Sequence, residues 1–389
     1  MIEKALQGSK GYWTWIACLL AVIAVGAACY AQQWNYGLGI TGMSRDVSWG
    51  LYISQFTFLV GVAAGGLMLV LPYYLHNYKE FGRITILGEF MAIAAIVMCL
   101  MFIIADLGQP MRALNVLLYP TPNSMLFWDM IVLNGYLALN LICGWAILHS
   151  EYKGVKYSSW VKPFIYLSIP WAISIHTVTA FLYAGLPGRD YWLNPILAPR
   201  FLASAFAAGP ALLLIIALIM ERNTLFKVGQ VAKDKLVTII SYAAGINFFF
   251  LVCELFSAYY SQYPSKMYTK DYLFFGLQKG DKVFNNLVPY MNFSVVIGLL
   301  GIVLILMARS RKSDLMLGVS CAMIFLSLWI DKGLGMVLGG FVPNPFGNVT
   351  EYYPSFQELG ITAAVWATGF LVVTILYKVA ISVKLEKEL

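Results

Sequence analysis

The sequence predicts an all-α integral membrane protein with about ten transmembrane helices. Hydrophobic residues make up 60% of its 389 residues and charged residues only 12%, whereas soluble domains are nearer one half apolar and one quarter charged. The apolar residues form long uninterrupted runs. No polar stretch between these runs is long enough to fold alone. Nearly the whole chain is therefore expected to lie in or against a bilayer.

Ten of these runs approach the length of about 20 apolar residues that a helix needs to cross the hydrocarbon core. They lie near residues 13–31, 52–75, 86–105, 127–148, 160–184, 199–220, 236–258, 288–308, 314–331 and 359–382. An even number of spans places both termini on the same side of the membrane.

The distribution of positive charge predicts the orientation of these spans. Of the 26 Lys and Arg residues, 17 fall on the side of the two termini. The other nine are Arg45, Arg112, Arg189, Arg200, Lys266, Lys270, Lys279, Lys282 and Lys332. Because cytoplasmic loops carry the excess of Lys and Arg, both termini are predicted in the cytoplasm. The net charge of +7 thus reflects topology, and we expect no nucleic-acid partner.

The predicted loops on the other side are longer and rich in Trp, Tyr, Pro and Asn. They lie near residues 32–51, 106–126, 185–198, 259–287 and 332–358. Single Trp and Tyr residues there are typical of an aromatic belt at the lipid interface. Taken together, the loops look more like a docking face for a partner outside the cytoplasm.

A short repeat suggests how the spans are grouped. Residues 62–65 (Val-Ala-Ala-Gly) in the second span are echoed by residues 206–209 (Phe-Ala-Ala-Gly) in the sixth. Small residues let helices approach closely in lipid, so each segment could mark a helix seam, although Ala and Gly are common in any membrane helix. The repeat predicts two four-helix bundles, spans 2–5 and 6–9, flanked by spans 1 and 10. The corresponding segments are 1–33, 34–198, 199–331 and 332–389.

Ionisable side chains inside spans are costly, so each is a functional candidate. The candidates are Glu89, Asp106, Asp129, His176, Glu254, Asp331 and Lys332. The six cysteines all fall in apolar runs without clustering, so they are expected to be packing residues and not ligands of a metal or an iron–sulfur cluster. His76 and His149 leave open one haem-binding pair near the cytoplasmic interface. No bound haem is expected in this chain.

His176 and Tyr183 lie seven residues apart and hence on one face of the fifth span. A Tyr and a His on one face can hydrogen-bond and protonate a carbonyl oxygen. The alternative is that His176 is an ordinary packing histidine.

The outer end of the first bundle concentrates polar and aromatic side chains. These are Trp49, Tyr52 and Gln55, with roughly one face in common, then Asp106 and Arg112 around a turn, and then Ser124, Trp128 and Asp129 at the next helix start. An Asp106–Arg112 ion pair is as good an interpretation as a catalytic one. The cluster suits a flat amphipathic ligand with two oxygens that arrives from the lipid, and a quinone fits this description.

Two buried acids suggest a path for protons. Glu254 lies seven residues after Asn247 on one face of the seventh span, and Glu89 lies one turn inside the cytoplasmic end of the third. For Glu254, a hydrogen bond between helices is an equally good interpretation.

Three segments resemble the NrfD-like membrane subunits typified by that of polysulfide reductase. They are Trp49-Gly50-Leu51-Tyr52 leading to residues 61–65; Asp106-Leu107-Gly108-Gln109-Pro110-Met111-Arg112 with Ser124-Met125 and Trp128; and Tyr183-Ala184-Gly185 with residues 192–195 and 201–205. Residues 41–46 and 174–178, together with the ten-span length, look most like the branch of subunit P of the Dsr membrane complex of sulfur-metabolising prokaryotes.

This resemblance implies a prokaryotic cytoplasmic membrane as the location. It also implies a site for menaquinone, as an exchangeable substrate, in the first bundle near the outer face. It implies an extracytoplasmic ferredoxin-like iron–sulfur partner, with further membrane and cytochrome subunits, and no haem or cluster in this chain. Tyr183 is the closest match to the family's quinone-contacting tyrosine. Gln109 departs from the Arg that the family commonly has, so one cation is missing near the site.

The leading hypothesis is therefore a quinone-reactive subunit of an electron-transfer complex, with proton translocation as a weaker extension. The predicted catalytic residues are His176, Tyr183 and Asp129. The predicted quinone-binding residues are Trp49, Tyr52, Gln55, Asp106, Arg112 and Trp128, and the predicted proton path contains Glu89 and Glu254. The alternatives are a secondary transporter, for which paired bundles with polar midplane residues are typical, and a structural anchor for partner subunits.

Overall fold

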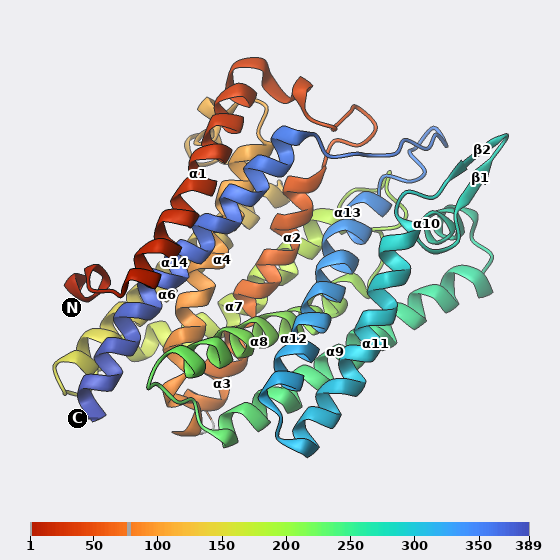
Figure 1. Ribbon diagram of the computed structural model, residues 1–389. Helices are drawn as coiled ribbons and strands as arrows, with labels where there is room; N and C mark the ends of the chain where they lie inside the picture. Colours follow the sequence, from red (N-terminus) through yellow and green to blue (C-terminus); the bar gives the residue numbers. More distant parts are fainter. Residues whose placement is uncertain (1, 76–78, 389) are drawn as a thin grey trace.

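The computed structural model describes residues 2–75 and 79–388 (Figure 1). Ten of its helices are long and apolar enough to span a membrane, which confirms the predicted fold class. The spans contain α1 (Lys10–Tyr36), α2 (Leu51–Ala64) with α3 (Leu67–Leu75), α4 (Thr85–Asp106), α6 (Met125–Tyr152), α7 (Val161–Ala184), α8 (Leu197–Asn223), α9 (Gln230–Tyr260), α11 (Val288–Arg311), α12 (Asp314–Leu328) and α14 (Phe356–Glu388).

The packing of these helices follows the predicted grouping. Helices α2, α4, α6 and α7 form the first four-helix bundle, and α8, α9, α11 and α12 form the second. Helices α1 and α14 pack along each other, and α14 also packs on α4. One continuous core of buried hydrophobic residues runs through both bundles.

The two repeats contact each other where the bundles meet, a closer association than the helix seam that the sequence suggested for each. A Cβ added at Gly65 would lie only 2.5 Å from the Cα of Gly209, and a Cβ at Gly209 would lie 2.5 Å from the Cα of Gly65. The backbones of α2 and α8 therefore touch at this point, which only glycine permits. Close approach of this kind is how helices associate in lipid.

The ninth span is longer than predicted. The sequence placed its end at Asp331 and Lys332, but the helix continues through a π-helical turn, η5 (Trp329–Gly335), into α13 (Met336–Gly339). The loop predicted at 332–358 thus begins only at residue 340, and the predicted segment boundary at 331 falls inside a helix. The prediction was wrong because two charged residues were taken as the end of the apolar run, whereas both are buried.

Short elements occupy the loops. They are η1 (Ile2–Leu6), η2 (Gly37–Ile40), η3 (Lys79–Arg83), η4 (Pro110–Arg112), α5 (Asn115–Leu118), α10 (Pro264–Phe274), β1 (Leu277–Lys279) and β2 (Lys282–Phe284). The two strands pair antiparallel, with Leu277 opposite Phe284, and Gly280 takes a positive φ of 59° between them. Neither α10 nor this hairpin was predicted from the sequence.

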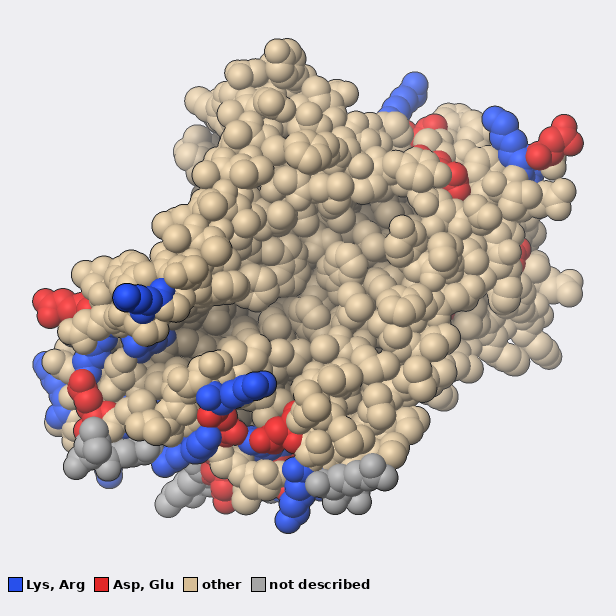
Figure 2. All heavy atoms as spheres, in the orientation of Figure 1, with Lys and Arg blue, Asp and Glu red and all other residues tan. Residues whose placement is uncertain are grey.

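Both chain ends lie at one end of the molecule, which we call the proximal end, where Lys4 and Glu386 form an ion pair (Figure 1). The opposite end, which carries the β-hairpin, is the distal end. In the space-filling view, Lys, Arg, Asp and Glu gather mainly at the proximal end, with a few at the distal end (Figure 2). Between them runs a broad uncharged band, as expected of a surface in contact with lipid.

Candidate functional site

His176 lies on α7 at the seam between the two bundles and is buried. Its Nε2 is 2.8 Å from the carbonyl oxygen of Phe201 on α8. A carbonyl can only accept, so Nε2 carries the proton and Nδ1 is left as an acceptor in the neutral ring. Nδ1 has no partner among the described residues. A small cavity, lined among others by Thr57 and Lys332, lies against the ring.

Tyr183 lies two turns further along α7 and is completely buried. Its hydroxyl hydrogen-bonds the hydroxyl of Thr57 on α2. Its ring packs edge-on against Trp49 and Trp192, with centroids 5.4 and 5.0 Å away. Phe201 contacts both the ring of His176 and the ring of Tyr183. The two predicted residues therefore share one environment.

These rings belong to a larger group at the distal end of the seam. We call it the aromatic cluster, and its members are Trp49, Tyr183, Trp192, Phe201 and Phe341. The indole of Trp192 also donates to the carbonyl oxygen of Met336, 2.8 Å away. Segments from both bundles and from the end of the ninth span are thus joined by apolar contact.

Asp129 on α6 is the third predicted catalytic residue and is buried. Its Oδ1 accepts a hydrogen bond of 2.7 Å from the hydroxyl of Thr179. Thr179 lies one helical turn before Tyr183, so the carboxyl group reaches the same face of α7. The first bundle therefore brings an acid, a hydroxyl and a phenol together.

A buried ion network lies beside the seam and was missed by the sequence analysis. Arg200 on α8 donates from Nη1 to Glu254 over 2.5 Å and from Nη2 to Asp331 over 2.7 Å. Lys270 donates to the same Glu254 over 2.9 Å. Lys332 has no hydrogen-bond partner among the described residues, and its Nζ lies 4.2 Å from the centroid of the Phe201 ring.

Residues 39–331 match the family described as polysulphide reductase, NrfD. The chain belongs to this family. A protein of Halobacterium salinarum, provisionally named as a membrane subunit of dimethyl sulfoxide reductase, is 26% identical over 91% of this chain and 83% of its own length. A selenate reductase subunit of Mesobacillus selenatarsenatis is 23% identical over 88% of this chain and 85% of its own length. The Hdr-like menaquinol oxidoreductase integral membrane subunit of Archaeoglobus fulgidus is 26% identical over 54% of this chain and 52% of its own length.

Family membership agrees with the ten spans, and the chain is a multi-pass membrane protein. The resemblance carried by the segments around Trp49, Asp106 and Tyr183 is thereby confirmed at the level of the NrfD family. The narrower resemblance to the Dsr branch stays a prediction.

The residues predicted at the start of α2 do not share a face. Trp49 precedes the helix and belongs to the aromatic cluster, so helical spacing does not apply to it. Tyr52 turns toward α1, where its hydroxyl donates to Gln33 over 2.6 Å. Gln55 accepts from the indoles of Trp329 and Trp366, 2.8 and 3.0 Å away. Tyr52 therefore faces the flanking helix α1, and Gln55 faces η5 and the flanking helix α14.

The remaining predicted quinone-binding residues do not join the buried site either. Asp106 ends α4 with its Oδ1 buried and without a partner, and no ion pair joins it to Arg112 within the described ranges. Arg112 lies exposed on η4. Trp128 is 42% exposed and donates to the carbonyl oxygen of Pro122. These three residues lie near the distal end of the first bundle but do not contact His176 or Tyr183, so their role in quinone binding stays a prediction.

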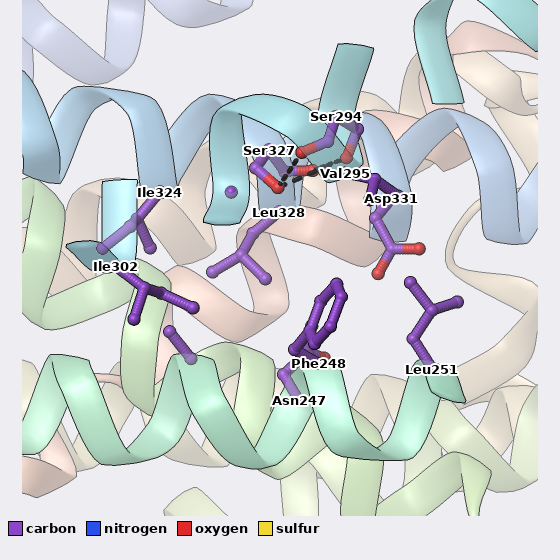
Figure 3. Close-up of a pocket in the computed structure, with 12 residues that line it drawn as sticks. Asn247, Phe248, Leu251, Ser294, Val295, Ile302, Ile324, Ser327, Leu328 and Asp331 are labelled. Carbon is purple, nitrogen blue, oxygen red and sulfur yellow. Dashed lines mark hydrogen bonds between the residues drawn. The ribbon is translucent and has the colours of Figure 1, made fainter. Parts of the chain in front are cut away.

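The two acids of the predicted proton path have different surroundings. Glu254 is engaged by Arg200 and Lys270. Its predicted companion Asn247 instead lines a cavity between α9 and the helices that carry Ser294 and Asp331 (Figure 3). Glu89 is buried near the proximal end of α4, and its Oε2 has no partner among the described residues.

Of the histidine pair that the sequence left open for a haem, the structure describes only His149. His76 lies outside the described residues. His149 stacks on Trp145, with ring centroids 6.4 Å apart. Within the part of the chain that the structure describes, no group of three or more His, Cys, Asp or Glu residues could hold a metal ion.

One signal in the sequence could have revealed the ion network. Arg200, Glu254 and Asp331 each lie within a predicted span, near the end that faces away from the two termini. Opposite charges at one depth on neighbouring spans are expected to pair, because an unpaired charge there is costly. Arg200 was instead counted only as a topology signal.

Proposed function

We propose that this chain is the quinone-reactive integral membrane subunit of an oxidoreductase complex. It exchanges electrons between the menaquinone pool and an iron–sulfur partner that docks at the distal end, outside the cytoplasm. The observation that carries the proposal is the buried pair of His176 and Tyr183, of which Tyr183 belongs to the aromatic cluster and His176 contacts it through Phe201. Membership of the NrfD family supports it, as does the similarity to a menaquinol oxidoreductase membrane subunit of Archaeoglobus fulgidus.

The side chains at this site match the needs of a quinone. Such a ligand takes up or releases two electrons and two protons. The unpartnered Nδ1 of His176 can hold a proton, and the hydroxyl of Tyr183 can donate to a ring oxygen. Asp129, hydrogen-bonded through Thr179, can supply or receive the second proton. These groups lie in a water-poor setting, where each hydrogen bond is strong.

The aromatic cluster would hold the ring and control its entry. The cavity beside His176 is too small for a quinone ring, so binding requires the rings of Trp49, Trp192 or Phe341 to move apart. Offset or edge-on contacts between aromatic rings are each worth about 0.5–1.5 kcal/mol. A quinone that replaces such contacts with its own therefore opens the cluster at little net cost.

The partners would lie at the distal end. Its loops carry α5, α10 and the β-hairpin, and exposed Met111, Tyr119 and Phe346 project from them. Exposed aromatic residues and Met are enriched where proteins bind one another. An iron–sulfur protein bound there would be near the aromatic cluster, and cytochrome or further membrane subunits would complete the complex.

The test is quinol-linked electron transfer in the assembled complex. We expect His176→Ala combined with Tyr183→Phe to abolish turnover with a menaquinol analogue while the complex still assembles. The matched control is His149→Ala combined with Tyr166→Phe, which changes the same residue types away from the seam. Full turnover in the first double variant would refute this site.

Proton translocation is a second proposal, favoured by one observation. Glu89 is buried without a partner for its Oε2, close to the proximal end where Lys384 and Glu151 pair over 3.1 Å. A proton entering there could be held by Glu89. In vesicles, Glu89→Gln is expected to lower proton uptake per electron while electron transfer continues. Uptake equal to that of the unaltered protein would remove this proposal.

A further inference from the structure

A groove of about 550 Å³ lies between α8 and α12 near the proximal end. Its walls are largely apolar, from Ile215, Leu218, Ile219, Leu315, Val319 and Ala322. Leu315, Ile219 and Val319 are 78%, 55% and 47% exposed, so the groove opens toward the surrounding lipid. Gly318 forms part of the wall, and a Cβ there would meet only a side-chain atom of Leu218, at 3.6 Å.

Charged residues lie at one end of this groove. Arg222 and Lys227 line it together with Glu221 and Asp314. Both acids are engaged by Lys233, whose Nζ lies 2.6 Å from Glu221 and 3.1 Å from Asp314. Glu221 also accepts from the backbone N–H of Val228 over 2.7 Å.

Positive side chains outnumber negative ones at this end of the groove. The guanidinium of Arg222 has no ion pair or hydrogen bond within the described ranges, and Lys227 donates to the carbonyl oxygen of Glu221 over 2.8 Å, which leaves its charge uncompensated. With Lys233, the three cations exceed the two anions by one. An apolar groove thus ends in one surplus positive charge, at the end of the molecule where charged side chains gather.

We propose that this groove binds one anionic membrane phospholipid. An acyl chain lies along the apolar walls, and the phosphodiester contacts Arg222 and Lys227. Basic pockets between membrane helices bind anionic headgroups in this way, and a single phosphodiester balances the surplus charge. A neutral lipid or an isoprenoid chain would leave that charge uncompensated. This inference does not depend on the proposed quinone chemistry.

The test uses the purified full-length chain in mild detergent. We expect added phosphatidylglycerol to raise its unfolding temperature and to be retained in native mass spectrometry as one bound molecule. Phosphatidylcholine and inorganic phosphate are expected to do neither, because one lacks the net charge and the other lacks the acyl chain. Equal effects from phosphatidylcholine or from phosphate would overturn the proposal.

Two variants locate the binding. Arg222→Gln with Lys227→Gln should weaken phosphatidylglycerol binding about tenfold or more, because two headgroup contacts are lost. Gly318→Leu should fill the groove and abolish retention while the lipid-free chain unfolds at its usual temperature. The matched control, Lys153→Gln with Lys156→Gln, removes two exposed proximal charges outside the groove and should bind normally. Unchanged binding in both groove variants would contradict the assignment.

Discussion

At the scale of single residues, the hydroxyl pair of Thr57 and Tyr183 makes a specific prediction. Each hydroxyl is buried. Thr57 also donates to the carbonyl oxygen of Ile53 over 2.7 Å, so it is the phenol of Tyr183 that must donate to Thr57. Thr57→Val keeps the shape and leaves the phenol without its acceptor. We expect a loss of about 1–3 kcal/mol in the free energy of unfolding.

The same change tests the role of Tyr183 in the proposed chemistry. The freed phenol can still donate to a quinone oxygen, so Thr57→Val should keep quinol-linked turnover, whereas Tyr183→Phe should lose most of it. Thermal unfolding and turnover of the two variants are compared in parallel. Equal loss of turnover in both would mean that packing alone explains the effect of Tyr183.

Arg200 predicts a larger loss of stability. Its guanidinium pairs with both Glu254 and Asp331. Arg200→Leu therefore leaves the negative charges of two buried carboxylates less well balanced. Breaking a buried pair in this way costs about 3–5 kcal/mol. Thermal unfolding in detergent should show the loss. Arg45→Leu is the control, because Arg45 is exposed, and a similar loss there would contradict the explanation.

The site was only partly predictable from single residues. His176 and Tyr183 were found because helical spacing relates residues on one span. Arg200 was missed because a charge near the end of a span was counted only as a topology signal. The positive charge of Arg200 is balanced by Glu254 and Asp331, which lie 54 and 131 residues away in the chain. Spacing along the sequence carries no information about such a contact.

At the scale of helices, the contact of α2 with α8 predicts a sensitive position. Gly65→Ala would place a methyl group 2.5 Å from the Cα of Gly209 and 3.1 Å from the carbonyl oxygen of Ala205. The backbones would have to separate, and overpacking of this kind costs about 1–3 kcal/mol. Gly245→Ala on α9 is the matched control, because an added Cβ there meets nothing within 4 Å. That control should be neutral or stabilising, since Ala favours helix over Gly by up to about 1 kcal/mol. Thermal unfolding of both variants measures the difference, and equal destabilisation would argue against a tight seam.

Helix ends were the least predictable elements. The apolar run of the ninth span was closed at Asp331 and Lys332, but the π-helical turn carries both charges inside the protein. A π-helical turn arises from an extra residue in the helix and is frequent at functional sites. The hairpin of β1 and β2 lies in a polar loop with three-residue strands, which are too short to show an alternating pattern.

At the scale of the whole molecule, the two bundles bear on the transporter alternative. Secondary transporters commonly interrupt corresponding helices of their two halves. Here the first bundle is interrupted at Gly65 and Gly66, in its first helix, whereas the second is interrupted at η5, in its last. Helix α8, which occupies the place of α2, is continuous with Pro210 inside it. The interruptions therefore do not correspond, which favours the proposed electron-transfer subunit.

The orientation of the whole molecule is the last prediction. The excess of Lys and Arg at the proximal end predicts that this end faces the cytoplasm, and the proposed docking of an exported partner requires it. A cysteine placed in the exposed hairpin turn, Asp281→Cys, should react with a membrane-impermeant maleimide in intact cells. Lys153→Cys, exposed in the loop between α6 and α7, should react only after permeabilisation. The unaltered chain serves as the control for its six native cysteines, which are all free. The reverse labelling pattern would mean that the proximal end faces outward. The aromatic cluster would then lie toward the cytoplasm, out of reach of any extracytoplasmic donor or acceptor.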